Sequence, residues 1–312
     1  MNKYEKEVQK SLLKNERDVL DLLEKTYLQS QIDILAKISE LLARNDTQNI
    51  RSIIYQLDYQ KALKKQIDAI IENLHTNTYN SISDYLIKCY EDGFIGTLYD
   101  LQKQGVPLIF PINQDEVVRA IELNSKLSKP LYDSLGIDIN DLKRNIRFEV
   151  SRGISQNFSY EEIARNLKLV SGNSYHNSVR IARTEGHRIS NEATYNVQVK
   201  AKNKGAKIMK QWDATMDYKT RTTHQSLDGQ LVDIDEPFVT VNGDKAMYPG
   251  GFDIPNEDIN CRCVILQRAK WFVDNEKEFT KMNGESNEIV DFKDVNDYDN
   301  FKREFWKWSE NK

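Results

Sequence analysis

The sequence predicts an α+β protein: a long, mainly helical N-terminal region, followed by a compact domain of helices with a small antiparallel sheet. The first proline is Pro107, and before it apolar residues recur at steps of three and four, as on one face of a helix. After Gly205 short apolar runs replace this pattern. The Asp-Gly and Asn-Gly dipeptides at 228–229 and 242–243 are typical of hairpin turns between strands.

The helical part is expected to contain several separate helices. Its first 75 residues fit two helices interrupted near residues 45–47, where Asn, Asp and Thr end one apolar stripe and Thr47 can cap the next helix. Tyrosines and glycines become frequent after residue 75, so we expect a new helix there rather than a continuation. The further helices are predicted over residues 82–101, 117–127, 131–135, 139–153 and 159–169.

Capping signals predict two more helix boundaries. Ser159 and Glu162 have the spacing of a capping box, in which each side chain bonds the backbone N–H of the other at a helix start. Ser178 is expected to cap a further helix that ends before Gly205, because glycine adopts the left-handed C′ conformation at little cost. One face of this helix is mostly small and predicts close approach of another element: Ala182, Gly186, Ile189, Ala193 and Val197.

Strands are expected after this helix over residues 207–212, 238–241 and 261–266, and the stretch 227–234 carries the Asp-Gly hairpin signal. Alternation along the last strand predicts that Cys261, Cys263 and Ile265 share one face. The tail after Trp271 is polar and acidic. It is expected to end in a small docking helix held by four aromatic residues, Phe301, Phe305, Trp306 and Trp308.

Composition excludes some classes of protein. The 312 residues carry a formal charge of −4, and no run of about 18 apolar residues could span a bilayer. The N-terminus lacks the apolar core of a signal peptide, so we expect a protein made in the cytosol that stays there unless another assembly carries it. Three cysteines argue against a disulfide framework.

Residues 180–221 have ten Lys or Arg and four Asp or Glu, an excess of 10 − 4 = +6. This local positive charge suggests contact with nucleic acid only as a secondary interpretation.

The polar residues of the C-terminal half allow three interpretations. In the first, His224, Cys261 and Cys263 bind zinc, with a fourth ligand from Asp217 or His187, although the Cys-x-Cys spacing is not the commoner one. In the second, His224 acts as a general base and a nearby arginine, Arg221 or Arg183, neutralises a developing phosphate charge, as in a metal-free nuclease.

The third interpretation is structural, and it is the one we favour. Arg221 and His224 lie one helical turn apart and could bond a strand layer, Asn260 would serve a turn, and the two cysteines would be packed thiols. A disulfide between Cys261 and Cys263 would be strained. The chain has no phosphate-binding P-loop, no Rossmann glycine pattern and no His-Glu-x-x-His motif.

An ordered set of residues resembles the phage head morphogenesis domain, the phage Mu F-like minor head protein family. The similarity covers roughly residues 150–267, and its most specific part is the final Asn-Cys-Arg-Cys. The residues that carry it are Arg183, Glu185, Asn191, Trp212, Asp217, Arg221, His224, Asn260, Cys261 and Cys263.

The resemblance implies a minor head protein of a tailed bacteriophage. Such a protein would bind the portal protein during procapsid assembly in the host cytoplasm, with scaffold or major capsid protein as further candidate partners. It would then lie inside the head of the virion in few copies, with a role in procapsid maturation, DNA packaging or ejection and with possible DNA contact. The resemblance implies no catalytic residue, no cofactor and no membrane segment; the alternative is a nuclease-like enzyme centred on His224 and Arg221.

The resemblance also divides the chain into three parts. Residues 1–150 would be a helical region that binds the portal, residues 151–270 the head morphogenesis domain, and residues 271–312 an acidic tail with an aromatic C-terminal helix. Some members of the family carry a toxin or transferase domain at the C-terminus. Only about 45 residues follow the domain here, too few for a separate enzyme fold.

Overall fold

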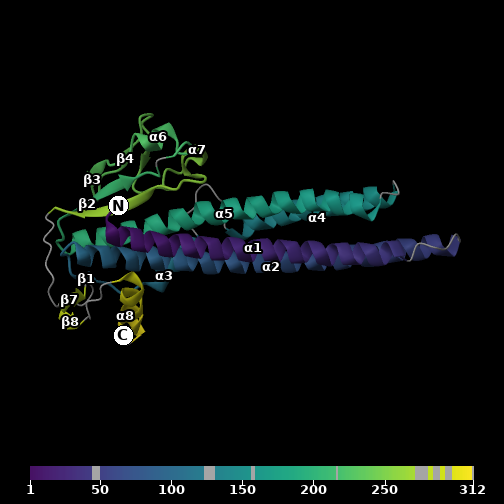
Figure 1. Cartoon of the computed structure of the whole chain (residues 1–312), viewed down its shortest axis with the longest axis horizontal. Coiled ribbons are helices and arrows are strands. Elements are labelled where there is room, and N and C mark those ends of the chain that lie inside the picture. The colour runs from purple at the N-terminus through teal and green to yellow at the C-terminus, as the bar shows by residue number, and fades with distance from the viewer. Residues whose placement is uncertain are drawn as a thin grey trace. The chain divides into compact units, whose positions relative to one another are not determined.

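The protein forms two compact units, each assembled from separate stretches of the chain (Figure 1). The computed structural model describes residues 1–43, 50–122, 131–155, 159–215, 217–270, 280–283, 289–291 and 297–310. The mixed unit, which contains both helices and strands, comprises Met1–Arg17, Asp84–Leu127 and Ala182–Lys312. The bundle unit, which is helical, comprises Asp18–Ser83 and Ser128–Ile181. The predicted α+β class is confirmed, since helices predominate and the main sheet is small and antiparallel.

Segments of four helices form the bundle unit. They belong to α1 (Lys3–Ala43), α2 (Ile50–Lys103), α4 (Leu131–Ser155) and α5 (Tyr160–Asn203). The apolar stripes predicted from the sequence supply its core, because residues three and four apart share one face of each helix. The core residues are Tyr27, Ile34, Ile38, Leu63, Ile67, Ile71, Leu74, Ile139, Leu142, Ile146, Val150, Ile163 and Leu167.

Helix α2 is continuous where the sequence suggested a new helix, so the predicted start near residue 82 is wrong. The polar stretch after residue 75 contains no proline or glycine to break the helix. The hydroxyls of Thr76 and Ser81 donate to the carbonyls of Glu72 and Asn77 at 3.1 and 2.7 Å. Such bonds to the preceding turn satisfy hydroxyl groups inside a helix, and the helix therefore passes through the segment.

Helix α5 is also longer than predicted, and Ser178 is not a cap. The capping box at its start is confirmed: Ser159 N donates to Glu162 Oε2 at 2.8 Å, and Glu162 N donates to Ser159 Oγ at 3.2 Å. Ser178 instead lies buried within the helix, and its Oγ is 2.8 Å from the hydroxyl of Tyr27 in α1. The predicted end is confirmed, since Gly205 has a φ of +89° directly after the helix.

Two other helix predictions need similar correction. The helices expected over residues 131–135 and 139–153 form one helix, α4, with no break between them. The helix expected over residues 117–127 begins earlier, as α3 (Gln114–Glu122), and residues 123–127 lie outside the described residues. None of the described helices has a stretch both long and apolar enough to cross a membrane.

The main sheet of the mixed unit has the order β3-β2-β6, with both pairs antiparallel. Its strands are β2 (Ile208–Asp213), β3 (Leu231–Asp233) and β6 (Val264–Ala269), and Trp212 lies opposite Ile265. A separate hairpin pairs β4 (Phe238–Val239) with β5 (Lys245–Ala246) through a turn in which Gly243 has a φ of +89°, as the Asn-Gly signal predicted. The Asp-Gly dipeptide at 228–229 is a turn too, but it follows the short helix α6 (Thr222–Gln225) rather than a strand.

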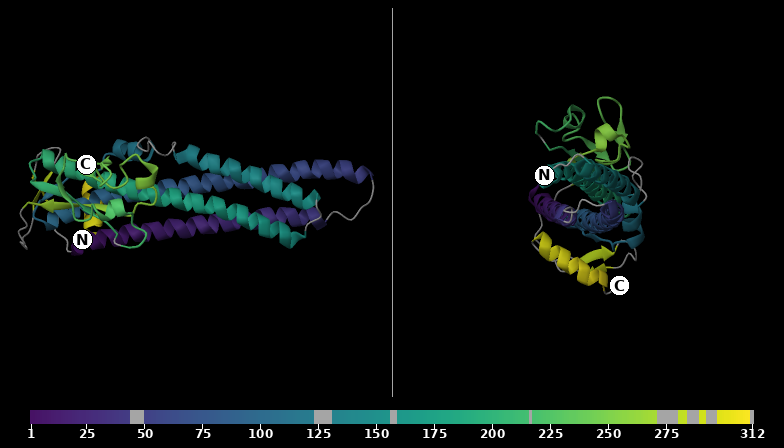
Figure 2. Two further views of the ribbon diagram at one scale, coloured as in Figure 1. Left: turned by 90° about the horizontal axis from the view of Figure 1, so that it is seen from above. Right: turned by 90° about the vertical axis from the view of Figure 1, so that its right-hand side faces the viewer.

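The C-terminal segment packs on the helices of the mixed unit (Figure 2). Strand β1 (Leu108–Ile109) pairs in parallel with β7 (Thr280–Asn283), which pairs with β8 (Ile289–Asp291). The predicted docking helix is α8 (Tyr298–Glu310). It buries Phe301 and Phe305 completely, and the Phe301 ring lies 5.3 Å from that of Tyr99 in α2.

The small face of α5 permits the close approach that its sequence predicted. Ala182, Ile189, Ala193 and Val197 are fully buried. A Cβ atom added at Gly93 of α2 would overlap the backbone carbonyl of Ser190, so the two helices touch through their main chains at this point.

We expect Gly93→Ala to lower the free energy of unfolding by about 1–3 kcal/mol, because a methyl group cannot fit against the Ser190 carbonyl. Gly172→Ala is the matched control: Gly172 is also within a helix, and its added Cβ would meet nothing within 4 Å. The control should gain about 0.5–1 kcal/mol from helix propensity. Urea unfolding of both variants measures the difference, and equal stability of the two would contradict the packing described here.

Candidate functional site

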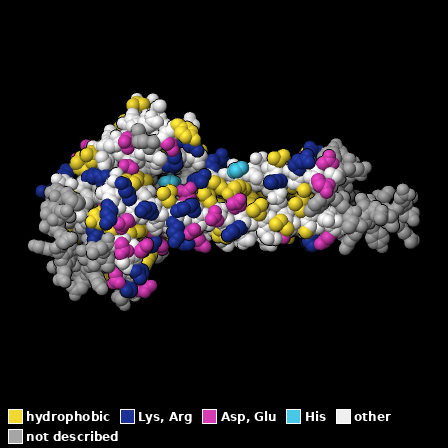
Figure 3. Space-filling model, viewed as in Figure 1, with side chains coloured by type: hydrophobic (Ala, Val, Ile, Leu, Met, Phe, Trp, Pro, Cys, Tyr) yellow, Lys and Arg dark blue, Asp and Glu magenta, His cyan; other side chains and the backbone are white. Residues whose placement is uncertain are grey.

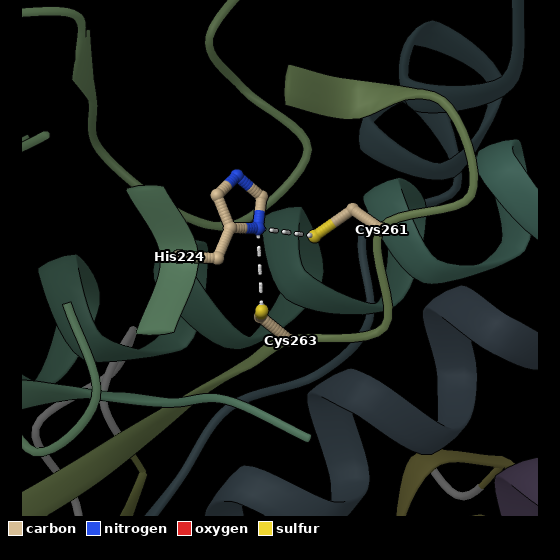
Figure 4. A group of neighbouring side chains, drawn as sticks. All are labelled: His224, Cys261 and Cys263. Carbon is tan, nitrogen blue, oxygen red and sulfur yellow. Dashed lines mark hydrogen bonds between the residues drawn. The ribbon is translucent and has the colours of Figure 1, made fainter. Parts of the chain in front are cut away.

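Three polar side chains from two loops converge in the mixed unit. His224 lies in α6, and Cys261 and Cys263 follow α7 (Pro255–Asp258) (Figure 4). Nδ1 of His224 is 3.6 Å from Sγ of Cys261 and 3.4 Å from Sγ of Cys263. We call these three residues the Cys-His cluster.

The turn after α7 directs both cysteines inward. Asp258 fixes the start of this turn, because its carboxylate accepts the backbone N–H groups of Phe252 and Ile254 at 3.2 and 3.3 Å. Asn260 has a φ of +57°, a left-handed conformation that asparagine tolerates better than most residues. Its N–H donates to Thr184 Oγ1 of α5 at 3.0 Å. The predicted turn role of Asn260 therefore has a clear geometric basis, and β6 begins at Val264, three residues later than expected.

Aromatic rings enclose the cluster. The His224 ring stacks on Phe252 at 5.6 Å and meets Trp212 edge-on at 5.4 Å, and Trp212 in turn meets Phe238. His224 is only 1% exposed. Cys261, Cys263 and Ile265 pack in one apolar core with Trp212, although the two cysteines precede the strand in which alternation placed them. The cluster is therefore a dry site, which a bulky substrate cannot reach.

A carboxylate lies behind the histidine. Nε2 of His224 is 2.9 Å from Oε2 of Glu257, which also accepts the Thr223 hydroxyl at 2.9 Å. The N–H direction at His224 Nε2 does not point at Glu257 Oε2, so this short contact is not an aligned hydrogen bond. Neither Glu257 nor Thr223 was among the residues that the sequence singled out.

The two thiols differ in acidity. The hydrogen bond with Cys261 lowers the pKa of Cys263, and His224 and Trp212 act in the same direction against the effect of burial. The same contact between the thiols, with burial, raises the pKa of Cys261.

Asn191 connects helix α5 to the strand that follows the cysteines. Its Oδ1 accepts the Ile265 N–H at 2.9 Å, and its Nδ2 donates to the Cys263 carbonyl at 3.1 Å and to the His187 carbonyl at 2.9 Å. The side chain is 4% exposed. Asn191 thus holds Cys263 at a fixed distance from α5, because its side chain hydrogen-bonds the backbone on both sides of Val264.

The charged residues of α5 form ion pairs away from the cluster. Arg183 donates to Glu16 at 2.8 Å, and Nε2 of His187 lies 3.7 Å from the same carboxylate, where hydrogen bonding to His187 helps lower the pKa of Glu16. Glu185 accepts from Arg188 at 2.8 Å. Sequence reasoning missed Arg188, which is buried and also bonds Glu192 at 2.7 Å, although spacings of three and four between opposite charges are a readable signal.

Asp217 and Arg221 do not join His224 in one constellation. Both carboxylate oxygens of Asp217 accept Arg262 at 2.6 Å, and this bond lowers the pKa of Asp217. Arg221 donates to the Ile259 carbonyl at 2.5 Å. Among the described residues, only the three members of the Cys-His cluster bring possible ligand atoms within 4.8 Å of one another, so neither Asp217 nor His187 supplies the fourth ligand weighed from the sequence.

These elements coincide with a known protein family. Residues 144–266 match the family described as phage Mu protein F like protein. This stretch of the chain is a phage Mu F-like domain, as the ordered motif predicted. The match includes α5, β2, α6, α7 and the first half of β6, the elements that build the Cys-His cluster.

Two relatives of this Mu F-like protein have different names. A protein named NAD(+)–arginine ADP-ribosyltransferase EFV, from Enterococcus faecalis, is 32% identical over 307 residues, or 96% of this chain. The alignment spans only 60% of that protein's length. Minor head protein GP7 of Bacillus phage SPP1 is 25% identical over 248 residues, which is 78% of this chain and 80% of that protein. No solved structure matches the chain significantly.

We expect Asn191→Ala to destabilise the mixed unit by at least about 1–3 kcal/mol, because the buried Ile265 N–H and Cys263 carbonyl lose their partner. Asn203→Ala, at the exposed end of the same helix, is the control and should change stability by less than about 0.5 kcal/mol. Thermal unfolding followed by tryptophan fluorescence reports on this region through Trp212. A loss of stability no larger than that of the control would show that the hydrogen bonds of Asn191 do not stabilise this region.

Proposed function

We propose that this protein is a structural minor head protein of a tailed phage that enters the head interior by binding the portal protein. The observation that carries the proposal is the match of residues 144–266 to the Mu F-like family, with the likeness to the SPP1 minor head protein over 78% of the chain. In this proposal assembly takes place in the host cytoplasm, and residues 151–270 form the head morphogenesis domain.

Residues 1–150 would supply the surface that binds the portal. Exposed apolar side chains on helix α1 support this role: Leu28 is 48% exposed and Ile32 is 58% exposed. They lie four residues apart, so they share one face of the helix. Exposed apolar groups that lie together are typical of protein-protein contacts.

We expect the full chain to co-purify with the portal protein of the same phage, and the double variant Leu28→Ser/Ile32→Ser to bind it about tenfold or more weakly. Val241→Ser, which removes a 73% exposed side chain from the mixed unit, is the control and should bind normally. Biolayer interferometry on purified proteins measures both. If Val241→Ser abolishes binding and the double variant does not, the portal surface lies outside α1.

DNA contact, if it occurs, would be electrostatic and weak. Much of the basic excess of residues 180–221 is neutralised within the protein, since Arg183, Lys200 and Lys202 each contact a carboxylate. On the face shown in Figure 3, Lys and Arg side chains are interspersed with Asp and Glu. No large area of one sign dominates that face.

We therefore expect duplex binding to be lost readily as salt rises. About three phosphate contacts would reduce the affinity roughly 40-fold between 50 and 200 mM salt, because binding releases counterions. Fluorescence anisotropy across this range measures the slope, and a salt-independent affinity would contradict the electrostatic proposal. The same samples should leave the duplex uncut over the incubation.

A catalytic role has less support. The nuclease-like alternative needs His224 to reach a phosphate, but the ring is 1% exposed and enclosed by aromatic residues, while Arg221 bonds a backbone carbonyl. The transferase name belongs to a relative of which 40% (100 − 60) lies outside the alignment. The non-enzymatic proposal is the one that the site geometry favours.

A further inference from the structure

The Cys-His cluster places two thiol groups beside a single imidazole nitrogen, Nδ1 of His224. A neutral imidazole has a single lone pair on Nδ1 when its proton is on Nε2, and that lone pair accepts one S–H group. Both sulfur atoms nevertheless lie within 3.6 Å of this one nitrogen, and they approach it from different directions (Figure 4). Hydrogen bonding to Nδ1 by itself therefore accounts for only one of the two approaches, whereas a shared metal ion accounts for both.

The distances are those of a tetrahedral metal site. Zinc lies about 2.3 Å from a thiolate sulfur and about 2.0–2.1 Å from an imidazole nitrogen, so tetrahedral angles place the nitrogen about 3.5 Å from each sulfur. The observed separations from Nδ1 are 3.6 Å to Cys261 and 3.4 Å to Cys263. Both nitrogen–sulfur separations therefore match those of zinc coordination, and all three ligand atoms lie within 4.8 Å of one another.

The surroundings of His224 fit a metal ligand as well. A histidine that binds metal through one ring nitrogen usually presents the other to a carboxylate, which fixes the tautomer and the ring orientation. Glu257 lies 2.9 Å from Nε2 and is itself held by Thr223. The indole N–H of Trp212, whose ring meets that of His224 edge-on, is buried with no aligned hydrogen-bond partner among the described residues.

We propose that His224 Nδ1, Cys261 Sγ and Cys263 Sγ bind one zinc ion. Two thiolates neutralise the dipositive charge, and a sulfur and nitrogen ligand set suits zinc better than magnesium or calcium. The described His, Cys, Asp and Glu residues offer no fourth ligand in the cluster, so the proposal assigns three protein ligands. Binding releases the thiol protons to solvent.

The ion would join two loops that have little secondary structure of their own. Helices α6 and α7 have four residues each, too few to be stable in isolation. His224 lies 37 and 39 residues before the two cysteines, so one ion would close a long loop between α6 and the start of β6. The role we assign to the metal is structural, and it is independent of the proposed portal binding.

The test is zinc content by plasma mass spectrometry on full-length protein, purified without chelator from zinc-supplemented cells. We expect about one zinc ion per chain. Cys263→Ser and His224→Ala should each lose most of it, while Cys89→Ala should keep it, because Cys89 is a buried cysteine of α2 outside the cluster.

A second measurement avoids dependence on variants that fail to fold. Wild-type protein stripped with a chelator should melt at a lower temperature and recover when zinc is restored, since a ligand of the native state stabilises it by mass action. Cobalt added in place of zinc should give the absorption of thiolate coordination. Wild-type protein that contains no zinc and gives no thiolate-cobalt absorption would overturn the proposal, and so would full zinc content in Cys263→Ser.

Discussion

The close approach of helix α5 to its neighbours is the constraint on which the mixed unit depends. Gly93 brings the main chain of α2 against Ser190, and the buried small residues Ala182 and Ala193 leave room beside α5. Asn191 can then reach the backbone on both sides of Val264. A bulkier face on α5 would hold the strand too far away for these bonds, and the cysteines would move with it.

The same arrangement limits what the Cys-His cluster can do. Aromatic rings and the turn after α7 bury His224, so its chemistry is available to a small ion but not to a nucleic acid strand. A buried site that ties short loops together suits a protein whose role is to be assembled into a larger particle. Short helices and turns unfold most easily, so contacts that hold them together contribute most to local stability there.

Partner binding would use other parts of the surface. Several cations of α5 contact carboxylates within the protein, which reduces the basic excess available to DNA. The apolar side chains of α1 at Leu28 and Ile32, in contrast, are exposed to solvent. Exposed apolar area supports protein contacts more directly than paired charges do, since the charges would first have to leave their partners.

The sequence by itself determined the local features of this protein. The apolar stripes, the capping box at Ser159, the end of α5 before Gly205 and the hairpin turn at Gly243 follow from periodicity and backbone preference, which act over a few residues. The grouping of Cys261, Cys263 and Ile265 followed from alternation, although the cysteines precede the strand. The family was also readable, because its motif is an ordered set of residue types.

Only the tertiary structure decided how long the helices are and which side chains meet. Ser178 has the chemistry of a cap, but Tyr27 from another helix bonds it inside α5, and no spacing in the sequence reveals that partner. Asp217 pairs with Arg262, while His224 turns inward to the two cysteines. Local rules cannot distinguish these pairings, because contacts between residues far apart in the chain depend on where the whole fold places each backbone.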